Sequence, residues 1–442
     1  MMKSRNKNFT QSVISTLFTK FILIFLKMGV GIITARFLGP AGRGLFYTSV
    51  QAPGLINTVG TLSIGEGLIY HIGKGKIKSD QIFGTVFMMV LGFTLVLSII
   101  FYFLISLLNQ HFFYQLPDKV IPLLFFLIPA TMTEYFSASA LRGLKVFSIV
   151  NKLTIVTRTN IFIFILTSLT FWSADLYRTI FAYAIALTLN ALLYFIVLFY
   201  QSKFRFSISS NELNNVIRYS AKVHIGSLLT EVEYRLDIFI LLFFLNATAV
   251  GIYSIGVTIA QILWYVSNSV NTVLFPYLTS TSKKNVDFFT VRVLKYNFFI
   301  NVFILFGLII IGFPLVNLLY GTMFSEAYFV FLVLSPGLLS DTIARSLAAW
   351  LKGTNRTLTL SKISSVSLVV NILFCIILIP YWGVYGAAIS SVISYTLRAV
   401  LLIKIFCKIS KTPLCHFFTF SEGELMKIKI NVIASIKKML YK

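Results

Sequence analysis

The sequence predicts an all-α polytopic membrane protein with about twelve transmembrane helices in two pseudo-symmetric six-helix lobes. The chain of 442 residues is 57% hydrophobic and only 12% charged, whereas a soluble domain carries about 25% charged residues. Apolar runs of about 20 residues, the length that crosses a bilayer as a helix, recur from end to end. Features of the first half of the chain also return in the second half.

The apolar runs define the predicted elements in order. Runs such as 86–108 and 180–200 are apolar on all sides, unlike the one-sided helices of a soluble core. The alternation typical of a β-barrel is missing. The predicted helical spans are residues 10–36, 44–71, 82–108, 118–142, 150–172, 177–200, 214–243, 249–277, 293–319, 327–351, 357–380 and 383–406. The short loops between them leave no room for a soluble catalytic domain.

The distribution of lysine and arginine predicts how the spans are oriented. If the N-terminus is cytoplasmic, the inner segments hold basic clusters such as 74–78 and 283–295, and the C-terminus is cytoplasmic too. The outer segments then hold only Arg36, Arg43, Lys119 and Arg178. This asymmetry is what the positive-inside rule requires. The net charge of +24 therefore reflects topology, and no nucleic-acid partner is expected.

The two halves of the chain resemble each other. Residues Phe37–Phe46 align with Phe244–Tyr253 at an offset of 207, and Leu141–Gly143 align with Leu351–Gly353 at an offset of 210. Two shorter matches share the second offset, namely Lys152 with Lys362, and Phe171-Trp172 with Tyr381-Trp382. The shift carries six spans onto six spans with the same direction through the membrane. Parallel repeats of this kind form transporters that work by alternating access.

The repeat divides the chain into three parts. Residues 1–205 form an N-terminal lobe, residues 206–410 a C-terminal lobe, and residues 411–442 a basic cytoplasmic tail. Within the tail, Ser421 and Glu424 have the spacing of a capping box that opens a helix. The tail is interpreted either as an amphipathic helix on the anionic inner leaflet or as a disordered basic segment.

The first span carries two lysines in otherwise apolar surroundings. Lys20 and Lys27 are seven residues apart, so they share one face of a helix about 10 Å apart along its axis. Thr16 and Thr34 lie on the same face. This polar stripe predicts one wall of a cavity. Pairing of each lysine with an acid of a neighbouring helix is the alternative, and Lys20 could instead extend to the inner membrane interface.

The seventh span has charges on two faces. Lys222, Glu233 and Asp237 share one face, whereas Glu231 and Arg235 share nearly the opposite one with His224. Both faces cannot line one cavity. Glu231 and Arg235 are four residues apart and could simply neutralise each other. The sequence leaves open which face lines the cavity.

Ionisable residues inside a membrane are costly and are typical of functional sites. The cations predicted to bind an anionic substrate are Lys20, Lys27, Arg36, Arg158, Lys222, Arg235 and Arg345. The carboxylates predicted to balance them, or to bind a coupling H⁺ or Na⁺, are Glu66, Glu134, Glu233, Asp237 and Asp341. Lysine and arginine suit phosphate groups.

No motif of an enzyme occurs in the sequence. There is no phosphate-binding loop of an ATPase and no metal-binding spacing of cysteine and histidine. The cysteines Cys375, Cys407 and Cys415 show no pairing pattern. Catalytic residues, metal ions and cofactors other than a coupling ion gradient are therefore not expected.

Several stretches resemble the bacterial polysaccharide and oligosaccharide flippases of the multidrug/oligosaccharidyl-lipid/polysaccharide exporter superfamily. Residues 35–45, ARFLGPAGRGL, are similar to the family's ARxLGPxGRG junction between the first two spans. YRLDI at 234–238, AVGIYS at 249–254 and VLFP at 273–276 resemble its second-half counterpart. The resemblance covers nearly the whole chain. It implies two lobes forming a V around a central cationic cavity, as in multidrug exporters of the superfamily.

The resemblance also implies a function. The expected substrate is an oligosaccharide repeat unit on undecaprenyl pyrophosphate, moved from the inner to the outer leaflet of the bacterial cytoplasmic membrane. A monomer is expected, with a polysaccharide polymerase and chain-length proteins of the O-antigen or capsule type as partners. A cation-coupled drug antiporter is the alternative, disfavoured by the basic interior. A membrane-embedded polymerase or ligase is less expected because the outer loops are short.

Overall fold

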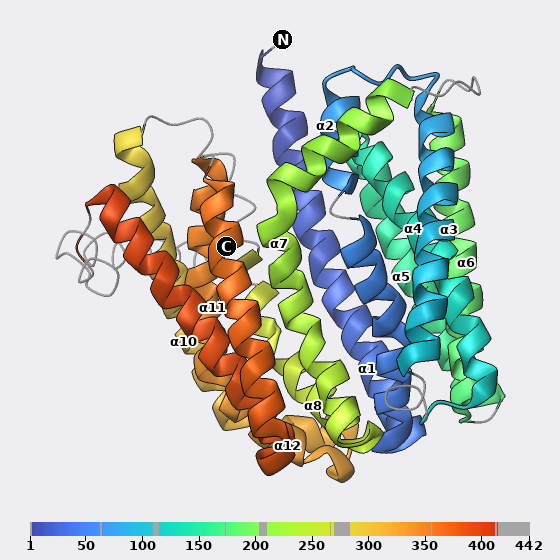
Figure 1. The fold of residues 1–442 in the computed structure, drawn as a ribbon, viewed down its shortest axis with the longest axis vertical. Coiled ribbons are helices and arrows are strands. Elements are labelled where there is room, and N and C mark those ends of the chain that lie inside the picture. The colour runs from blue at the N-terminus through green and yellow to red at the C-terminus, as the bar shows by residue number, and fades with distance from the viewer. Residues whose placement is uncertain are drawn as a thin grey trace, which may run out of the picture.

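The structure is a computed structural model that describes residues 2–61, 64–108, 115–172, 174–202, 210–265, 267–268, 283–354, 356–411 and 413. Side chains are described in these ranges except at 2–18, 20–21, 107–108, 210–213, 218–219, 221–224, 227 and 283–286. The tail predicted at 411–442 lies almost entirely outside the described residues. All regular structure in the described part of the chain is helical (Figure 1).

The chain begins with a helix that turns back on itself. Helix α1 (Met2–Thr61) is broken at Gly39, whose φ of +65° is a left-handed conformation that favours glycine. Pro40 follows and starts the returning helix with a preset backbone. One element therefore holds the first predicted span and the start of the second, which α2 (Ile64–Gly73) completes.

The remaining helices of the first half follow the predicted spans closely. They are α3 (Ile82–Leu108), the 3₁₀ turn η2 (Asp118–Val120), α4 (Ile121–Gly143), α5 (Phe147–Phe171) and α6 (Leu176–Gln201). Asp175 caps α6, because its carboxylate accepts a hydrogen bond from the Arg178 amide at 3.1 Å.

The second half begins with a long charged helix, α7 (Ser210–Phe244). It continues with α8 (Ala247–Ala260), α10 (Lys283–Tyr320), the 3₁₀ turn η3 (Thr322–Phe324), α11 (Glu326–Gly353) and α12 (Thr357–Ser410). Helix α12 is broken at Gly383, with φ +56°, so it holds the last two predicted spans.

Within the described residues, nine helical segments are long and apolar enough to cross a membrane. The segment in α12 holds two predicted spans, the segment in α1 holds the first span and the start of the second, and α7 holds the charged seventh span. The predicted class, a multi-pass helical membrane protein with about twelve spans, is confirmed. Large apolar side chains such as Leu95, Phe103 and Phe303 are more than 60% exposed, which suits contact with lipid tails rather than water.

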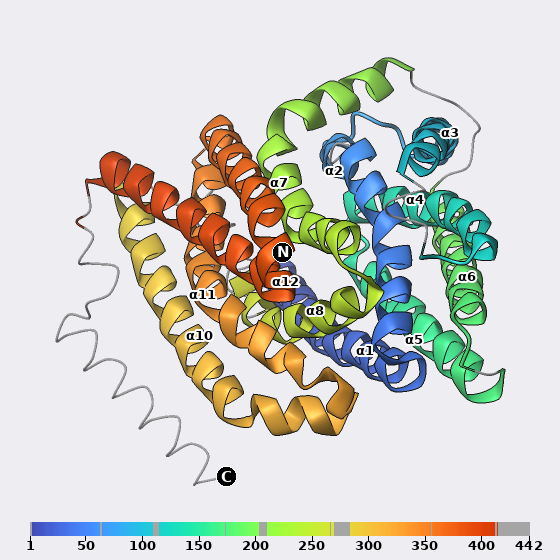
Figure 2. The ribbon, with the colours of Figure 1, turned by 60° about the horizontal axis from the view of Figure 1, so that its bottom comes forward.

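The helices form two groups that converge at one end. In Figure 1, α10 to α12 lean away from the first half towards the top and meet it at the bottom. Figure 2 shows this lower end, where α8 lies against α1. One cluster of buried apolar side chains fills the first half from Phe46 to Leu198 and reaches Val216 of α7. Two further clusters fill the second half.

The internal repeat appears as a reciprocal contact between the halves. A Cβ on Gly44 would lie 1.8 Å from the Ala247 carbonyl oxygen, and a Cβ on Gly251 would lie 2.0 Å from the Pro40 carbonyl oxygen. These are equivalent positions of the repeat, because an offset of 207 carries Gly44 onto Gly251 and Pro40 onto Ala247. Only residues without a side chain allow α1 and α8 to approach this closely.

A second pair of repeat positions lies on the surface. Phe171 and Trp172 at the end of α5 are 84% and 56% exposed, and Tyr381 and Trp382 beside the break in α12 are 81% and 56% exposed. Exposed tryptophan and tyrosine are typical of the boundary between lipid tails and water. Both pairs fall at predicted outer ends of spans.

Candidate functional site

A cavity of about 420 Å³ lies in the first half of the chain. Its walls come from the returning part of α1 and from α4, α5 and α6, with Arg235 contributed by α7. Most of the residues that line it are of polar type, although the surrounding helices are apolar. The polar lining consists of Gln51, Asn57, Thr58, Thr61, Thr131, Thr154 and the aromatic residues Tyr135, Tyr183 and Tyr194.

One polar atom of the cavity lacks a partner. The Asn57 amide nitrogen donates to the Thr131 hydroxyl, but the Asn57 Oδ1 atom is buried and accepts no hydrogen bond from the described residues. Buried acceptors without a donor are uncommon and costly. This oxygen is therefore an unsatisfied acceptor at the wall of the cavity.

The charged groups of the cavity are mainly basic. Three arginines line it, Arg142, Arg158 and Arg235, against one carboxylate, Glu134. Arg158 Nη2 lies 2.9 Å from Glu134 Oε1, and 43% of its side chain is exposed. Arg142 stands in the last turn of α4, and its side chain forms no hydrogen bond or ion pair with the described residues. The cavity therefore carries an excess of positive charge.

Arg235 joins the two halves of the molecule. It donates to Gln51 Oε1 at 3.3 Å and lies 3.9 Å from Glu231 Oε2 on its own helix. Arg235 and Glu231 therefore form the long ion pair that the sequence allowed as one of two alternatives. Arg235 nevertheless also faces the cavity.

Lys27 lies between the halves rather than in the wall of the cavity. Its Nζ donates to Gln261 Oε1, just after α8, at 2.8 Å, and its side chain is otherwise exposed. The charges of Arg235, Arg43 and Arg158 act on it. Four cations therefore lie near one another around the first helix, with no described carboxylate bound to Lys27.

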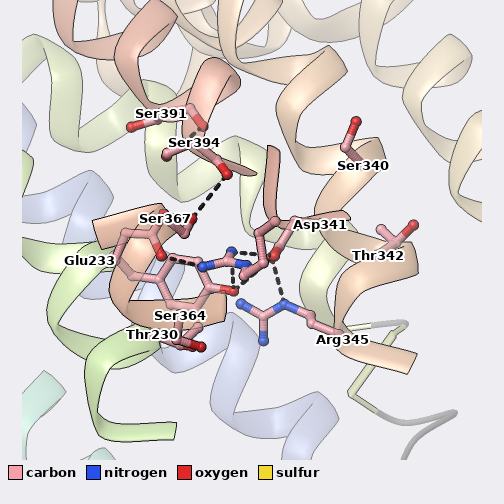
Figure 3. Close-up of polar contacts among 12 residues, drawn as sticks. Thr230, Glu233, Ser340, Asp341, Thr342, Arg345, Ser364, Ser367, Ser391 and Ser394 are labelled. Carbon is pink, nitrogen blue, oxygen red and sulfur yellow. Dashed lines mark hydrogen bonds and ion pairs between the residues drawn. The ribbon is translucent and has the colours of Figure 1, made fainter. Parts of the chain in front are cut away.

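Two carboxylates of the second half, Glu233 and Asp341, lie in a separate ion cluster (Figure 3). Arg398 of α12 bridges Glu233 of α7 and Asp341 of α11, at 2.6 Å from Asp341 Oδ1. Arg345 Nε lies 2.8 Å from Asp341 Oδ2, and the Tyr234 hydroxyl donates to both Asp341 oxygens at 2.9 Å. Two guanidinium groups thus balance two buried carboxylates.

Asp237 is the buried carboxylate beside this cluster. Its oxygens accept hydrogen bonds from the Tyr253 hydroxyl, from the Ile238 amide at 2.9 Å and from the Ser391 hydroxyl at 3.5 Å. None of its contacts among the described residues is with a cation. Hydrogen-bond donors therefore take the place of a neighbouring cation at this buried carboxylate.

The structure separates several residues that the sequence grouped together. Arg36 was expected to bind substrate, but its guanidinium donates to the carbonyls of Leu318 and Leu319 at the end of α10, outside the cavity. Arg345 likewise lies outside it. Glu66, one of the carboxylates predicted to balance the cations, lies within electrostatic reach of Lys352 of α11. The side chains of Lys20 and Lys222 lie outside the described part of the chain.

Two important residues are absent from the sequence-based set. Arg398 interrupts the apolar span 383–406. The search for ionisable residues inside apolar spans, which found the other candidates, could therefore have found it. Arg43 was assigned to an outer segment because it follows the Gly-Pro turn, but it is only 5% exposed and donates to Thr34 at 2.9 Å. Within the described residues, no group of three or more histidine, cysteine, aspartate or glutamate side chains could hold a metal ion.

Solved structures share the fold. A structure described as the lipid II flippase MurJ in an inward closed conformation superposes with a TM-score of 0.71 over 98% of this chain and 99% of the other, at 18% identity. An inward-facing multidrug resistance MATE family transporter of the MOP superfamily gives 0.70 over 90% of this chain and 99% of the other, at 14% identity. At such identities the likeness shows the fold alone.

Two relatives are similar in sequence. The chain is 22% identical over 197 residues to a probable low-salt glycan biosynthesis flippase, Agl15, of Haloferax volcanii. The aligned region covers 44% of this chain and 41% of that protein. It is 24% identical over 387 residues to an uncharacterised membrane protein of Methanocaldococcus jannaschii, covering 80% of this chain and 75% of that protein. A family model described as polysaccharide biosynthesis protein matches residues 9–282, more than half of the chain, so the chain belongs to the polysaccharide biosynthesis protein family.

Proposed function

We propose that the protein is a flippase that moves oligosaccharide repeat units linked to undecaprenyl pyrophosphate from the inner to the outer leaflet. The observation that carries the proposal is the composition of the cavity, which combines three arginines with tyrosine, threonine and asparagine side chains. Arginine is suited to phosphate and acidic sugars. Hydroxyl, amide and aromatic groups suit the polar edges and apolar faces of sugars.

The arrangement of the cations supports an entry route. Gly143, next to Arg142, packs against Ile72 near the end of α2, so this end of the cavity lies beside the basic loop 74–78 that we place in the cytoplasm. A pyrophosphate entering there meets Arg142 first, then Arg158 and Arg235, with Lys27 beyond. The lipid tail stays in the bilayer while the head group crosses between the lobes 1–205 and 206–410.

The buried carboxylates are proposed to supply balance and coupling. Glu233 and Asp341 hold the second half in its present packing through Arg398. Asp237, whose described contacts include no cation, is our candidate for the coupling site, and we assign a proton to it as the coupling ion. No catalytic step is needed for this cycle.

A drug antiporter is the second candidate, because a multidrug transporter shares the fold. Cationic drugs need carboxylate or aromatic groups that are free to receive them. In the cavity described here the one carboxylate, Glu134, is bound to Arg158. The excess of arginine favours an anionic substrate.

The test is a deletion strain analysed for lipid-linked intermediates and surface polysaccharide. Deletion should cause undecaprenyl-pyrophosphate-linked oligosaccharide to accumulate in the inner leaflet, and the wild-type gene should reverse this. Lys27→Ala should leave the protein in the membrane but restore export poorly, and Lys119→Ala, at an exposed outer position, should restore it fully. Normal surface polymer without accumulation in the deletion strain would contradict the proposal.

A further inference from the structure

The structure contains a buried cation for which the proposed function has so far supplied no role. Arg43, just after the Gly39-Pro40 turn, is 5% exposed and forms no ion pair with a described carboxylate. Its Nη1 donates to Thr34 Oγ1 at 2.9 Å, and its Cζ lies 5.2 Å from the centre of the Tyr47 ring. Its Nε is buried and has no hydrogen-bond partner in the described residues.

A second unsatisfied group faces Arg43 from the other half of the molecule. Tyr320, the last residue of α10, is 3% exposed, and its hydroxyl is buried without a described partner. Both groups meet at Gly31, where a Cβ would lie 3.9 Å from Arg43 Nη2 and 3.9 Å from the Tyr320 oxygen. Each half therefore brings a donor group close to Gly31, and the Arg43 Nε and the Tyr320 hydroxyl have no hydrogen-bond partner among the described residues.

Lys27 is the adjacent cation. It stands one helical turn before Gly31, so its backbone lies about 6 Å along α1 from the point where Arg43 and Tyr320 meet. The charges of Lys27 and Arg43 act on each other. Lys27 is exposed on one side of this point, and Arg43 is enclosed on the other.

We infer that Arg43 is the second cation of a diphosphate site, in which Arg43 binds one phosphate and Lys27 binds the other. The inference rests on the proposed function, because it assigns the diphosphate to a lipid-linked sugar. Unsatisfied donors of Arg43 and Tyr320 match the oxygens of one phosphate, while Lys27 matches the other. Tyr320 belongs to the second half, so separation of the halves uncovers Arg43 on the outer side and directs the diphosphate towards release.

The test uses the full chain, purified and reconstituted in lipid nanodiscs. Binding of inorganic pyrophosphate and inorganic phosphate is measured by titration calorimetry, and undecaprenyl pyrophosphate is measured in a parallel set of nanodiscs. The wild type should bind pyrophosphate more tightly than phosphate. Arg43→Gln should weaken pyrophosphate binding roughly tenfold to hundredfold and change phosphate binding much less, because Lys27 alone can hold one phosphate.

Two variants control for damage to the fold. Arg43→Lys keeps the charge and should recover part of the preference for pyrophosphate, whereas Lys119→Gln, at an exposed outer position, should bind as the wild type does. A purely structural role of Arg43 would lower stability without altering the ratio of pyrophosphate to phosphate affinity. Unchanged pyrophosphate binding by a folded Arg43→Gln protein would overturn the inference.

Two comparisons separate this inference from the proposed function. If the deletion strain accumulates lipid-linked oligosaccharide but Arg43→Gln restores export and binds pyrophosphate normally, the inference fails and the flippase stands. If the wild type binds inorganic pyrophosphate but not undecaprenyl pyrophosphate, the diphosphate site stands and its assignment to a lipid carrier fails.

Discussion

Single residues decide how charge is held inside this membrane protein. Arg398 is 2% exposed and is shared by two fully buried carboxylates, Glu233 and Asp341. Burying an ion pair brings little net stability, but removing one partner leaves an uncompensated charge. Arg398 is therefore expected to be among the most sensitive positions of the chain.

Replacement of Arg398 tests this expectation. Arg398→Gln should lower the free energy of unfolding by about 3–5 kcal/mol, because both carboxylates lose their bridging cation. The thermal unfolding midpoint of the purified protein in detergent measures the effect. The double variant Arg398→Gln with Glu233→Gln removes one stranded charge and should recover part of the loss. Equal stability of the single variant and the wild type would contradict the role given to Arg398.

The ion pair in the cavity is of a different kind. Arg158 is 43% exposed and Glu134 is 14% exposed, so their attraction is screened and contributes little to stability. Glu134→Gln should release Arg158 and strengthen pyrophosphate binding a few-fold, whereas Arg158→Gln should weaken it. Titration of reconstituted protein with pyrophosphate measures both, and weaker binding by Glu134→Gln would be inconsistent with an anionic substrate.

At the scale of elements, two glycine breaks set the path of the chain. Gly39 has φ +65° with no atom within 4 Å of a Cβ, so a side chain there meets backbone strain but no clash. Gly39→Ala should therefore cost about 1–2 kcal/mol of stability. Gly92, within α3 and equally unobstructed, is the matched control, and Gly92→Ala should be neutral or stabilising. Equal thermal unfolding midpoints for the two variants would contradict a specific need for glycine at position 39.

Much of the architecture could be predicted because it depends on local sequence. Apolar runs give the spans, and the Gly39-Pro40 pair marks the end of one helix and the start of the next. The spacing of Glu231 and Arg235 correctly indicated their contact. Such features need only the periodicity of a helix and the geometry of its ends.

The candidate site was less predictable because helical periodicity does not identify the opposite helix. Arg36 lies in the same helix as Lys27, yet its guanidinium donates hydrogen bonds to carbonyl oxygens at the end of α10. Arg43 was placed in an outer segment by its position after the turn, but the chain folds its side chain back onto Thr34. Arg345 and Asp341, predicted in different roles, bind each other. Those contacts depend on packing between distant segments.

At the scale of the whole molecule, α1 and α8 form a close contact between the two halves. Gly44 and Gly251 allow the backbones of the two helices to touch, and each would collide with a carbonyl oxygen if it carried a Cβ. Any side chain at either position must push the halves apart at this end.

Gly251→Val should therefore favour an arrangement that is open at the α1–α8 end. Spin labels on α1 and α8, measured by pulsed electron resonance, should report a longer distance than in the wild type. Gly307→Val is a suitable control, because nothing lies within 4 Å of a Cβ on Gly307. Identical distances in a folded Gly251→Val protein would show that the helices absorb the side chain locally.

The matched aromatic pairs at Phe171-Trp172 and Tyr381-Trp382 have a consequence for the surrounding lipid. Because both pairs fall at predicted outer ends of spans, these equivalent side chains would hold both halves at the same depth of one leaflet. If the halves rock, their anchored ends stay level and their opposite ends must travel through the other leaflet. The work of that motion then depends on bilayer thickness, since a mismatch between helix length and hydrocarbon depth has an energetic cost. The acyl-chain length of the surrounding lipids would therefore change the transport rate, independently of the substrate concentration.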